Sequence, residues 1–215
     1  MELQLDLVND INLNDLIKIK FCEKCNFYFS DSLNSQEDYN NYYLNFNNYK
    51  AQNYCLDKDN RCFEYLLANV STHKSVLDYG SGNNILYNLL KTSYTEVDCF
   101  DIGMPINNNL YDVIILSHVL EHIYDLPTFI NTVSNNLNVD GLLYIEIPNA
   151  EYYDKMSDIC PLQEINLEHI NFFSKYALNK FMIANNYVCL KLDDDFFYHK
   201  NDIKYYVIRG IFKKI

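Results

Sequence analysis

The sequence predicts an α/β fold in which helices cover a doubly wound, mostly parallel sheet. From residue 60 onward, short apolar runs alternate with segments of helical spacing, and the run over 111–120 is nearly continuous, as in a central parallel strand. Asp78, Gly80 and Gly82 directly follow the first apolar run. Because the chain has only 5 glycines in 215 residues, this pair indicates a backbone requirement that other residues meet poorly.

We expect helices where apolar residues recur every three or four positions, and strands where short apolar runs end in polar residues. The strand-like segments are, in chain order, 75–80, 96–103, 111–120, 141–149, 187–199 and 203–214. The helical segments are 62–70, 83–91, 126–137 and 174–186. Pro127 suits a first helical turn, Ser174 suits an N-cap, and Pro148 ends its strand.

The length corresponds to one domain with an appendage. We expect the fold-bearing domain to span 55–215. Residues 1–54 form the appendage, whose last part, 34–53, is dense in Asn and Tyr and has no clean periodicity. There is no internal repeat.

Composition excludes several classes of partner. The net charge of −12 argues against nucleic acid, which needs a basic surface, and against an anionic membrane. No apolar run approaches the ~20 residues of a membrane span, and the acidic start lacks the layout of a signal peptide. Seven cysteines, an odd number, fit reduced thiols, so we expect a cytoplasmic protein.

The turn after the first strand has the features of a nucleotide-type site. Glycines let the backbone approach a ligand closely, and the following helix offers free N–H groups. A second strand ends at Asp101, 21 residues after Gly80. An acid at that place can accept hydrogen bonds from both ribose hydroxyls, which indicates an adenosine-type cofactor across the ends of the first two strands.

Four phrases in this order resemble the class I S-adenosylmethionine-dependent methyltransferases: VLDYGSG, FDIG, YDVIILSHVLEHIYD and LNVDGLLYIEIPN. The resemblance runs from about residue 60 to the end and implies a Rossmann-like sheet with an antiparallel last strand. It also implies S-adenosylmethionine as the cofactor. The residues that it assigns to cofactor binding are Asp78, Gly80, Ser81, Gly82, Asp101, Ile102, Ser117 and His118.

Residues 168–188 resemble a segment of a subgroup that includes sugar C- and O-methyltransferases. This resemblance implies a small hydroxylated acceptor, a sugar or nucleotide sugar, with O-methylation favoured. We expect His169 to be the catalytic base, tuned by Glu168. If His169 is structural instead, His118 or His122 is the alternative base.

The chain also departs from the family pattern. Asn84 stands where the third glycine is usual, and only 11 positions separate Asp101 from Asp112. That interval cannot hold a helix and a strand at about 1.5 and 3.3 Å per residue, so we expect the family's third strand to be missing. The exposed edge would then be covered by segment 34–54 or by a second copy of the chain, as in a homodimer. These departures leave a second hypothesis open, a degenerate fold that binds or scaffolds without catalysis.

Residues 19–32 resemble the second half of a small zinc-binding module whose first Cys-x-x-Cys is absent here. Cys22 and Cys25 could bind zinc together with Cys55 and Cys62, because an all-cysteine site needs four thiolates. The alternative is a vestigial module with free cysteines and no metal.

Overall fold

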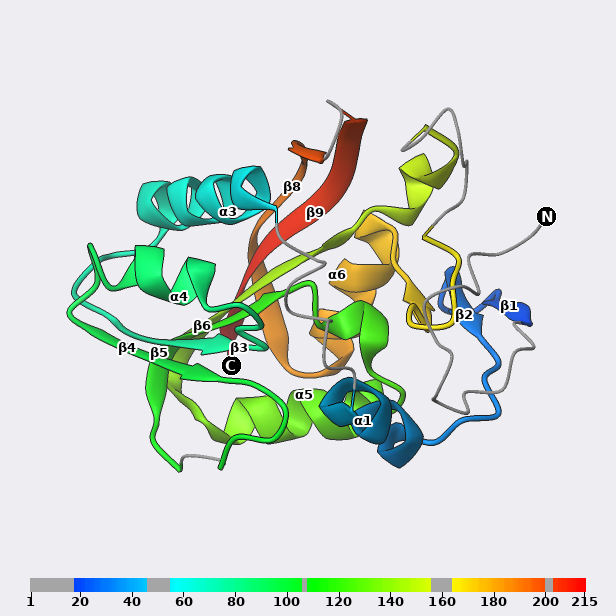
Figure 1. Cartoon of the computed structure of the whole chain (residues 1–215), viewed down its shortest axis with the longest axis horizontal. Coiled ribbons are helices and arrows are strands. Elements are labelled where there is room, and N and C mark those ends of the chain that lie inside the picture. Colours follow the sequence, from blue (N-terminus) through cyan, green and yellow to red (C-terminus); the bar gives the residue numbers. More distant parts are fainter. Residues whose placement is uncertain (1–17, 46–54, 106–107, 156–163, 200–202) are drawn as a thin grey trace.

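The computed structural model describes residues 18–45, 55–105, 108–155, 164–199 and 203–215. A six-stranded sheet runs through the centre of the molecule (Figure 1). Its strands lie in the order β4 (Glu96–Phe100), β3 (Ser75–Tyr79), β5 (Tyr111–Ser117), β6 (Leu137–Pro148), β9 (Ile203–Lys214) and β8 (Tyr187–His199).

The four strands from β4 to β6 are parallel, whereas β9 is antiparallel to both of its neighbours, β6 and β8. The predicted parallel sheet with an antiparallel last strand is therefore confirmed. β4 lies at the sheet edge, and the described residues between Gly103 and Leu110 form no strand, as the short interval predicts.

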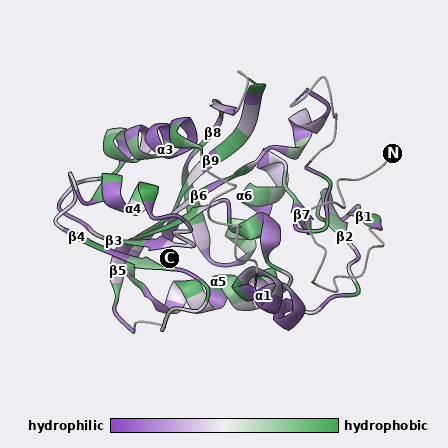
Figure 2. Cartoon of the chain, in the orientation of Figure 1, coloured by the Kyte–Doolittle hydropathy of each residue, from purple (hydrophilic) through white to green (hydrophobic). Residues whose placement is uncertain are grey.

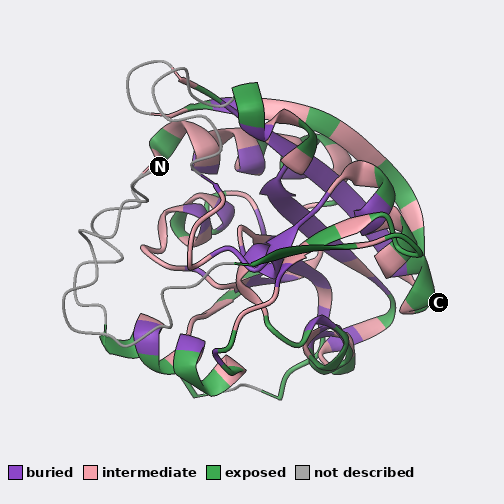
Figure 3. Cartoon of the chain, turned by 90° about the vertical axis from the view of Figure 1, so that its right-hand side faces the viewer, coloured by how far each residue is buried: buried purple, intermediate pink, exposed green. Residues whose placement is uncertain are grey.

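Helices cover the two faces of the sheet because successive strand residues point to opposite sides. On β5, Val113 and Ile115 pack with α3 (Leu56–Asn69) and α4 (Ile85–Leu90). Ile114 and Leu116 pack instead with α5 (Leu126–Asn135) and α6 (Lys175–Ala184). Figure 2 shows hydrophobic residues along these central strands, and Figure 3 shows that they are buried.

The helix ends follow the predicted signals. The Ser174 side chain accepts a hydrogen bond from the Ala177 N–H and caps α6, and Pro127 lies in the first turn of α5. Asp125, one residue before α5, caps that helix through the Thr128 N–H. Such caps satisfy N–H groups that have no partner within the helix.

Residues 18–45 pack near the carboxyl ends of the parallel strands. β1 (Ile19–Cys22) and β2 (Phe27–Ser30) form a hairpin, and β2 pairs with β7 (Asn171–Phe172) of the main domain. Helix α1 (Gln36–Asn45) lies near the short helix η1 (Leu120–His122) after β5. A second short helix, η2 (Ala150–Lys155), follows β6.

The expected cover for the sheet edge is only partly testable. Within segment 34–54, residues 46–54 lie outside the described part of the chain. Leu44 reaches the loop after β4, because a Cβ on Gly103 would lie 2.9 Å from its side chain. The described part of the segment therefore contacts the loop after β4 and the loop after β5.

Every cysteine in the described ranges is a free thiol. No helix in these ranges is both long and apolar enough to cross a membrane.

Candidate active site

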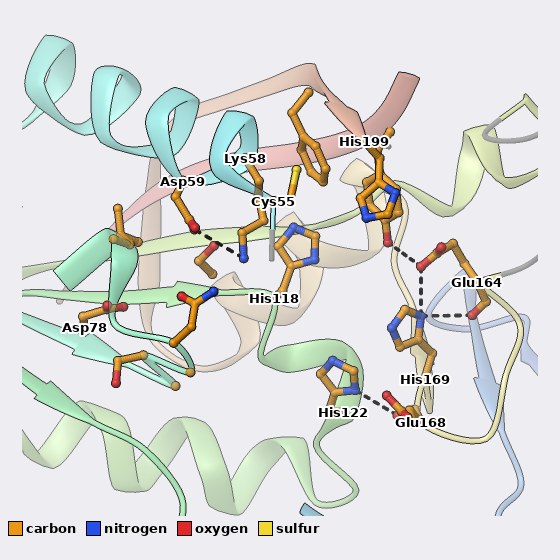
Figure 4. Close-up of a pocket in the computed structure, with 18 of the residues that line it drawn as sticks. Cys55, Lys58, Asp59, Asp78, His118, His122, Glu164, Glu168, His169 and His199 are labelled. Carbon is orange, nitrogen blue, oxygen red and sulfur yellow. Dashed lines mark hydrogen bonds and ion pairs between the residues drawn. The ribbon is translucent and has the colours of Figure 1, made fainter. Parts of the chain in front are cut away.

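A cavity of about 410 Å³ opens at the carboxyl ends of β3 and β5, within the range of small-molecule sites (Figure 4). The connection after β3 runs to β4 on one side of the sheet, and the connection after β5 runs to β6 on the other, so the strand order reverses between β3 and β5. In an open α/β sheet this is the place where ligands bind. The sequence resemblance expected the cofactor there.

The glycine turn after β3 forms one wall. Gly80 has a φ of +83°, and a Cβ there would meet Val119 at 2.7 Å, so no larger residue fits. Gly82 also has a positive φ, +51°. Asn84, in the position of the expected third glycine, has a φ of 62° and is the N-cap residue of α4. Asparagine tolerates this left-handed conformation, so the turn forms without a third glycine.

Asp78, the last-but-one residue of β3, is 2% exposed, and its Oδ2 accepts no hydrogen bond from a described residue. Burial raises the pKa of Asp78 to about 7. Ser81 follows in the turn, and its buried hydroxyl likewise has no hydrogen-bond partner among the residues that the structure describes. Orphaned buried polar groups of this kind are suited to contact a polar ligand.

Of the other predicted cofactor residues, some line the cavity and some do not. Ser117 and His118 line it, at the end of β5. Asp101 and Ile102 do not line this cavity, and the Ile102 N–H donates to Asp101 Oδ1 at 2.9 Å. They follow β4 beside the glycine turn, because the Gly80 N–H donates to the Phe100 carbonyl at 2.7 Å.

His118 lies between two buried carboxylates, with its Nδ1 3.1 Å from Glu121 Oε1 and its Nε2 3.5 Å from Glu146 Oε1. Burial alone would lower the pKa of His118, but the two glutamates outweigh it and raise the pKa to about 9. The same contact lowers the pKa of Glu146 to about 2 against the opposing effect of burial. Both groups are therefore charged at neutral pH.

Glu146 also accepts a hydrogen bond from Arg209 Nε at 2.7 Å, and Arg209 reaches on to Asp195. Arg209 and Glu146 are 2% and 0% exposed. The sequence analysis identified none of these three residues. A lone arginine in an apolar strand was the available signal.

Two further histidines line the opposite side of the cavity. The His122 Nδ1 lies 3.0 Å from the Glu168 carbonyl oxygen, and the His169 Nδ1 lies 3.0 Å from the Glu164 carbonyl oxygen. The rings of His122 and His169 are 4.8 Å apart. Burial lowers the pKa of His122, which favours its neutral form.

The expected pairing of His169 with Glu168 is wrong. The carboxylate beside His169 is that of Glu164, at 3.3 Å from Nδ1. Glu168 turns away, because its carboxylate accepts a hydrogen bond from the Tyr42 hydroxyl at 2.5 Å. The loop bends at residues 166–168, where the Glu168 and His169 N–H groups both donate to Asn166 Oδ1. Adjacent side chains of such a bend point in different directions, so adjacency in sequence did not bring this pair together.

Helix α3 contributes a group that the sequence analysis missed. Lys58 and Asp59 line the cavity, with Lys58 Nζ 3.5 Å from Asp59 Oδ1 (Figure 4). The predicted helix began only at residue 62, whereas α3 begins at Leu56. The acids of its first turn were the missed signal.

The proposed four-cysteine zinc site is not assembled. Cys22 and Cys25 lie in the β1–β2 hairpin, Cys55 lines the cavity, and Cys62 is 0% exposed in the core. In the described ranges, the one group of three metal-ligating side chains within reach of one another is Glu121, His122 and His169.

Comparison with protein families matches residues 48–192 to a methyltransferase-domain family. A comparison with curated proteins finds no match. Of the solved structures, 1,6-didemethyltoxoflavin-N1-methyltransferase from Burkholderia thailandensis has a TM-score of 0.65 and 12% identity, covering 92% of this chain and 100% of its own. It was crystallised with its acceptor and S-adenosylhomocysteine.

Two other solved structures are also similar. Coclaurine N-methyltransferase, bound to N-methylheliamine and S-adenosylhomocysteine, has a TM-score of 0.54 and 14% identity over 76% of this chain and 73% of its own. An S-adenosylmethionine-dependent methyltransferase from Clostridium acetobutylicum has a TM-score of 0.51 and 13% identity over 82% and 98%. At these identities the similarity shows a shared fold.

Proposed function

The chain belongs to the methyltransferase-domain family, and we propose that it transfers a methyl group from S-adenosylmethionine to a hydroxyl of a small metabolite, a sugar or nucleotide sugar. The observation that carries this proposal is the division of the cavity. The glycine turn and Asp78 line one side, and imidazole, carboxylate and amide groups line the other. Donor and acceptor would meet between them.

The cofactor side suits S-adenosylmethionine. The turn is open at Gly82, where a Cβ would meet no atom nearer than 4.0 Å, so a ligand can approach the backbone there. The carboxyl of Asp78 offers a buried hydrogen-bonding group. We keep Asp101 and Ile102 as ribose contacts in this proposal. They follow β4, next to the glycine turn, and the ribose would bridge the two strand ends.

The acceptor side supports a polyhydroxylated ligand. Glu164, Asn166 and His169 bring carboxylate, amide and imidazole groups to the cavity. Phe197 and Tyr205 stack on each other at 4.8 Å beside them and offer a flat apolar wall. Several hydrogen-bonding groups against an aromatic wall match a sugar ring, which has polar edges and apolar faces.

The two solved neighbours that were crystallised with a small molecule besides S-adenosylhomocysteine are both named as N-methyltransferases. In this chain we favour oxygen, because residues 168–188 resemble the sugar-methylating subgroup and deliver His169 into the cavity. A hydroxyl is a weak acid, so its methylation needs a group that accepts or displaces the proton.

His169 is the catalytic residue of this proposal. Its Nδ1 faces the Glu164 carbonyl oxygen, which can only accept, so the ring proton lies on Nδ1 and Nε2 carries the lone pair. With Nε2 free, the imidazole accepts the hydroxyl proton as oxygen bonds to the methyl carbon. The carbon–sulfur bond breaks, sulfur keeps the electron pair, and S-adenosylhomocysteine is released. Glu168 contributes by holding Tyr42 and, through its carbonyl, His122.

The test combines cofactor calorimetry with a transfer screen. S-adenosylhomocysteine should bind with a stoichiometry of one per chain, and tritiated methyl should pass from S-adenosylmethionine to at least one nucleotide sugar. The deoxy analogue that lacks the methylated hydroxyl is the matched acceptor control and should receive no label. Amines of similar size form a parallel panel.

Each outcome separates the alternatives. Label on amines alone would refute the hydroxyl acceptor and leave the methyltransferase. Absence of S-adenosylhomocysteine binding in a folded protein would refute the enzyme and favour the degenerate binding module.

A further inference from the structure

We propose that Glu121, His122 and His169 together bind a divalent transition-metal ion at the wall of the acceptor half of the cavity, which the two histidines line. One ligand atom from each of the three side chains lies within 4.8 Å of the others. Two donors on one zinc ion at about 2.0–2.1 Å can be at most about 4.2 Å apart, so side-chain shifts of an ångström or less close the site.

Main-chain contacts present both imidazoles in the form that binds metals. His122 and His169 each direct Nδ1 at a backbone carbonyl, those of Glu168 and Glu164, at 3.0 Å in both cases. The Tyr43 hydroxyl also lies 2.9 Å from His122 Nδ1 and can accept from it. Because a carbonyl only accepts, we assign both ring protons to Nδ1, which leaves both Nε2 lone pairs available. Metal-bound histidines are typically oriented in this way by the groups behind them.

Glu121 provides an independent indication. It is 1% exposed, yet neither carboxylate oxygen accepts a hydrogen bond from the described residues. Its charged contacts are the imidazoles around it, with His118 Nδ1 at 3.1 Å and His122 Nε2 at 4.0 Å from Oε1. His118 balances the charge of Glu121 at Oε1, while the buried Oε2 accepts no hydrogen bond from the described residues and is available to an ion.

The fold holds the three ligands together by main-chain bonds. The Ile170 N–H donates to the Glu121 carbonyl at 2.7 Å, and the Asn171 side chain donates to the Leu120 and Ile123 carbonyls at 2.8 and 2.6 Å. The loop that carries His169 is thereby fastened to η1, which carries the other two ligands. Such support from the surrounding structure is what a metal site needs to keep its geometry.

Two imidazoles and one carboxylate favour an ion such as zinc, cobalt, iron(II) or manganese over magnesium, which prefers oxygen ligands. Three protein ligands leave at least one coordination position open. The site therefore fits a catalytic ion whose open position faces the cavity.

This inference rests on the proposed function and would change the role of His169 in it. In the ion-free protein His169 Nε2 is the base, but with an ion bound this nitrogen would be a ligand and could not accept the proton. The ion would then lower the pKa of an acceptor hydroxyl at its open position, as it does for bound water. The hydroxyl proton would leave to solvent as oxygen bonds to the methyl carbon, and sulfur would keep the electrons of the broken carbon–sulfur bond.

Cobalt(II) is the probe, because it reports its ligands by visible absorption. Chelator-treated protein should bind one cobalt ion per chain, without cofactor or acceptor. His122→Asn, His169→Asn and Glu121→Gln should each weaken binding at least tenfold. Circular dichroism melts verify that each variant is folded. His73→Ala is the matched control, since His73 is exposed and far along the chain from the cavity, and its binding should not change.

Two results would overturn the proposal: no cobalt binding by the folded wild-type protein, or equal binding by folded site variants. An intense thiolate charge-transfer band that disappears in Cys22→Ser/Cys25→Ser would place the ion in the hairpin instead and would also overturn it. S-adenosylhomocysteine calorimetry on the same sample separates the two proposals. Cofactor binding without cobalt binding refutes only the metal site, and cobalt binding without methyl transfer to any hydroxyl refutes only the acceptor.

Discussion

Replacing Asp78 with asparagine should stabilise the cofactor-free protein at neutral and alkaline pH. Asp78 is buried, and its Oδ2 has no hydrogen-bond partner among the described residues. Its pKa rises to about 7 because burial disfavours the charged form. Above pH 7 the folded protein therefore carries a buried charge that asparagine, of nearly the same shape, removes.

The magnitude follows from the two pKa values. An unfolded aspartate has a pKa of about 3.9, so the folded value is about three higher, which corresponds to at most about 4 kcal/mol. A raised carboxyl pKa means that the folded state binds more protons, and wild-type stability therefore falls as pH rises from about 4 to 7. We expect Asp78→Asn to raise the free energy of unfolding by about 1–4 kcal/mol at pH 8 and by less than about 1 kcal/mol at pH 4.

Urea denaturation of both proteins from pH 4 to pH 9, without cofactor, measures this difference. Asp112→Asn is the control of opposite sign. The Asp112 carboxylate accepts from Ser75 and Asn138, and these bonds hold its pKa below the ordinary value against the effect of burial. Its replacement should cost stability above about pH 4. An Asp78→Asn variant that is destabilised equally at every pH would refute the argument.

Three further substitutions test other parts of the site. Asp101→Ala should weaken S-adenosylhomocysteine binding at least tenfold by removing charge-assisted hydrogen bonds of roughly 1.5–3 kcal/mol each, and unchanged calorimetric affinity would show that the ribose lies elsewhere. His169→Asn should lower kcat by about 10²–10⁴ with little change in cofactor affinity or Tm, whereas a lower Tm with normal turnover would make His169 structural. Arg209→Met should lower the free energy of unfolding by about 3–5 kcal/mol, because it removes one of the two cations beside buried Glu146 and leaves its Oε2 without that charged partner, and a loss below 1 kcal/mol in urea denaturation would contradict that reasoning.

The sheet could be predicted because local signals and long-range packing agree. Val113 and Ile115 face one layer of helices, and Ile114 and Leu116 face the other, so a strand buried on both sides reads as an uninterrupted apolar run. The 11 positions between Asp101 and Asp112 are too few for a helix and a third strand, and the described residues of that interval form no strand. The glycine pair also located the turn after β3 in the sequence. The structure gives the reason for Gly80, because a Cβ there would lie 2.7 Å from the Val119 side chain.

The acceptor side of the site could be predicted only in part. The resemblance pointed to His169, which lines the cavity, but not to its neighbour Glu164, because a loop's side-chain directions depend on contacts remote in sequence. Tyr42 shows this dependence: it lies 126 residues before Glu168 and takes up that carboxylate. Tyr42 lies on α1, whose sequence has no clear periodicity, so no local signal indicated that this helix would pack against the loop that carries Glu168.

Asp78, which lines the cavity, and Glu146, which lies buried behind His118, are strand-borne carboxylates that differ in how their charge is supported. Glu146, between His118 and Arg209, has its pKa lowered to about 2 and is charged over the whole range in which the protein is expected to fold. Asp78 has no such contact with a cation among the described residues, and its pKa is raised to about 7.

A cationic cofactor would supply a positive charge beside Asp78. Its binding should therefore lower the pKa of Asp78 and remove part of the stability cost at alkaline pH. The stabilisation of wild-type protein by S-adenosylmethionine should then grow between pH 6 and pH 8, while in Asp78→Asn it should be independent of pH. Thermal melts with saturating cofactor compare the two directly, and equal pH profiles would show that Asp78 does not contact the cofactor's positive charge.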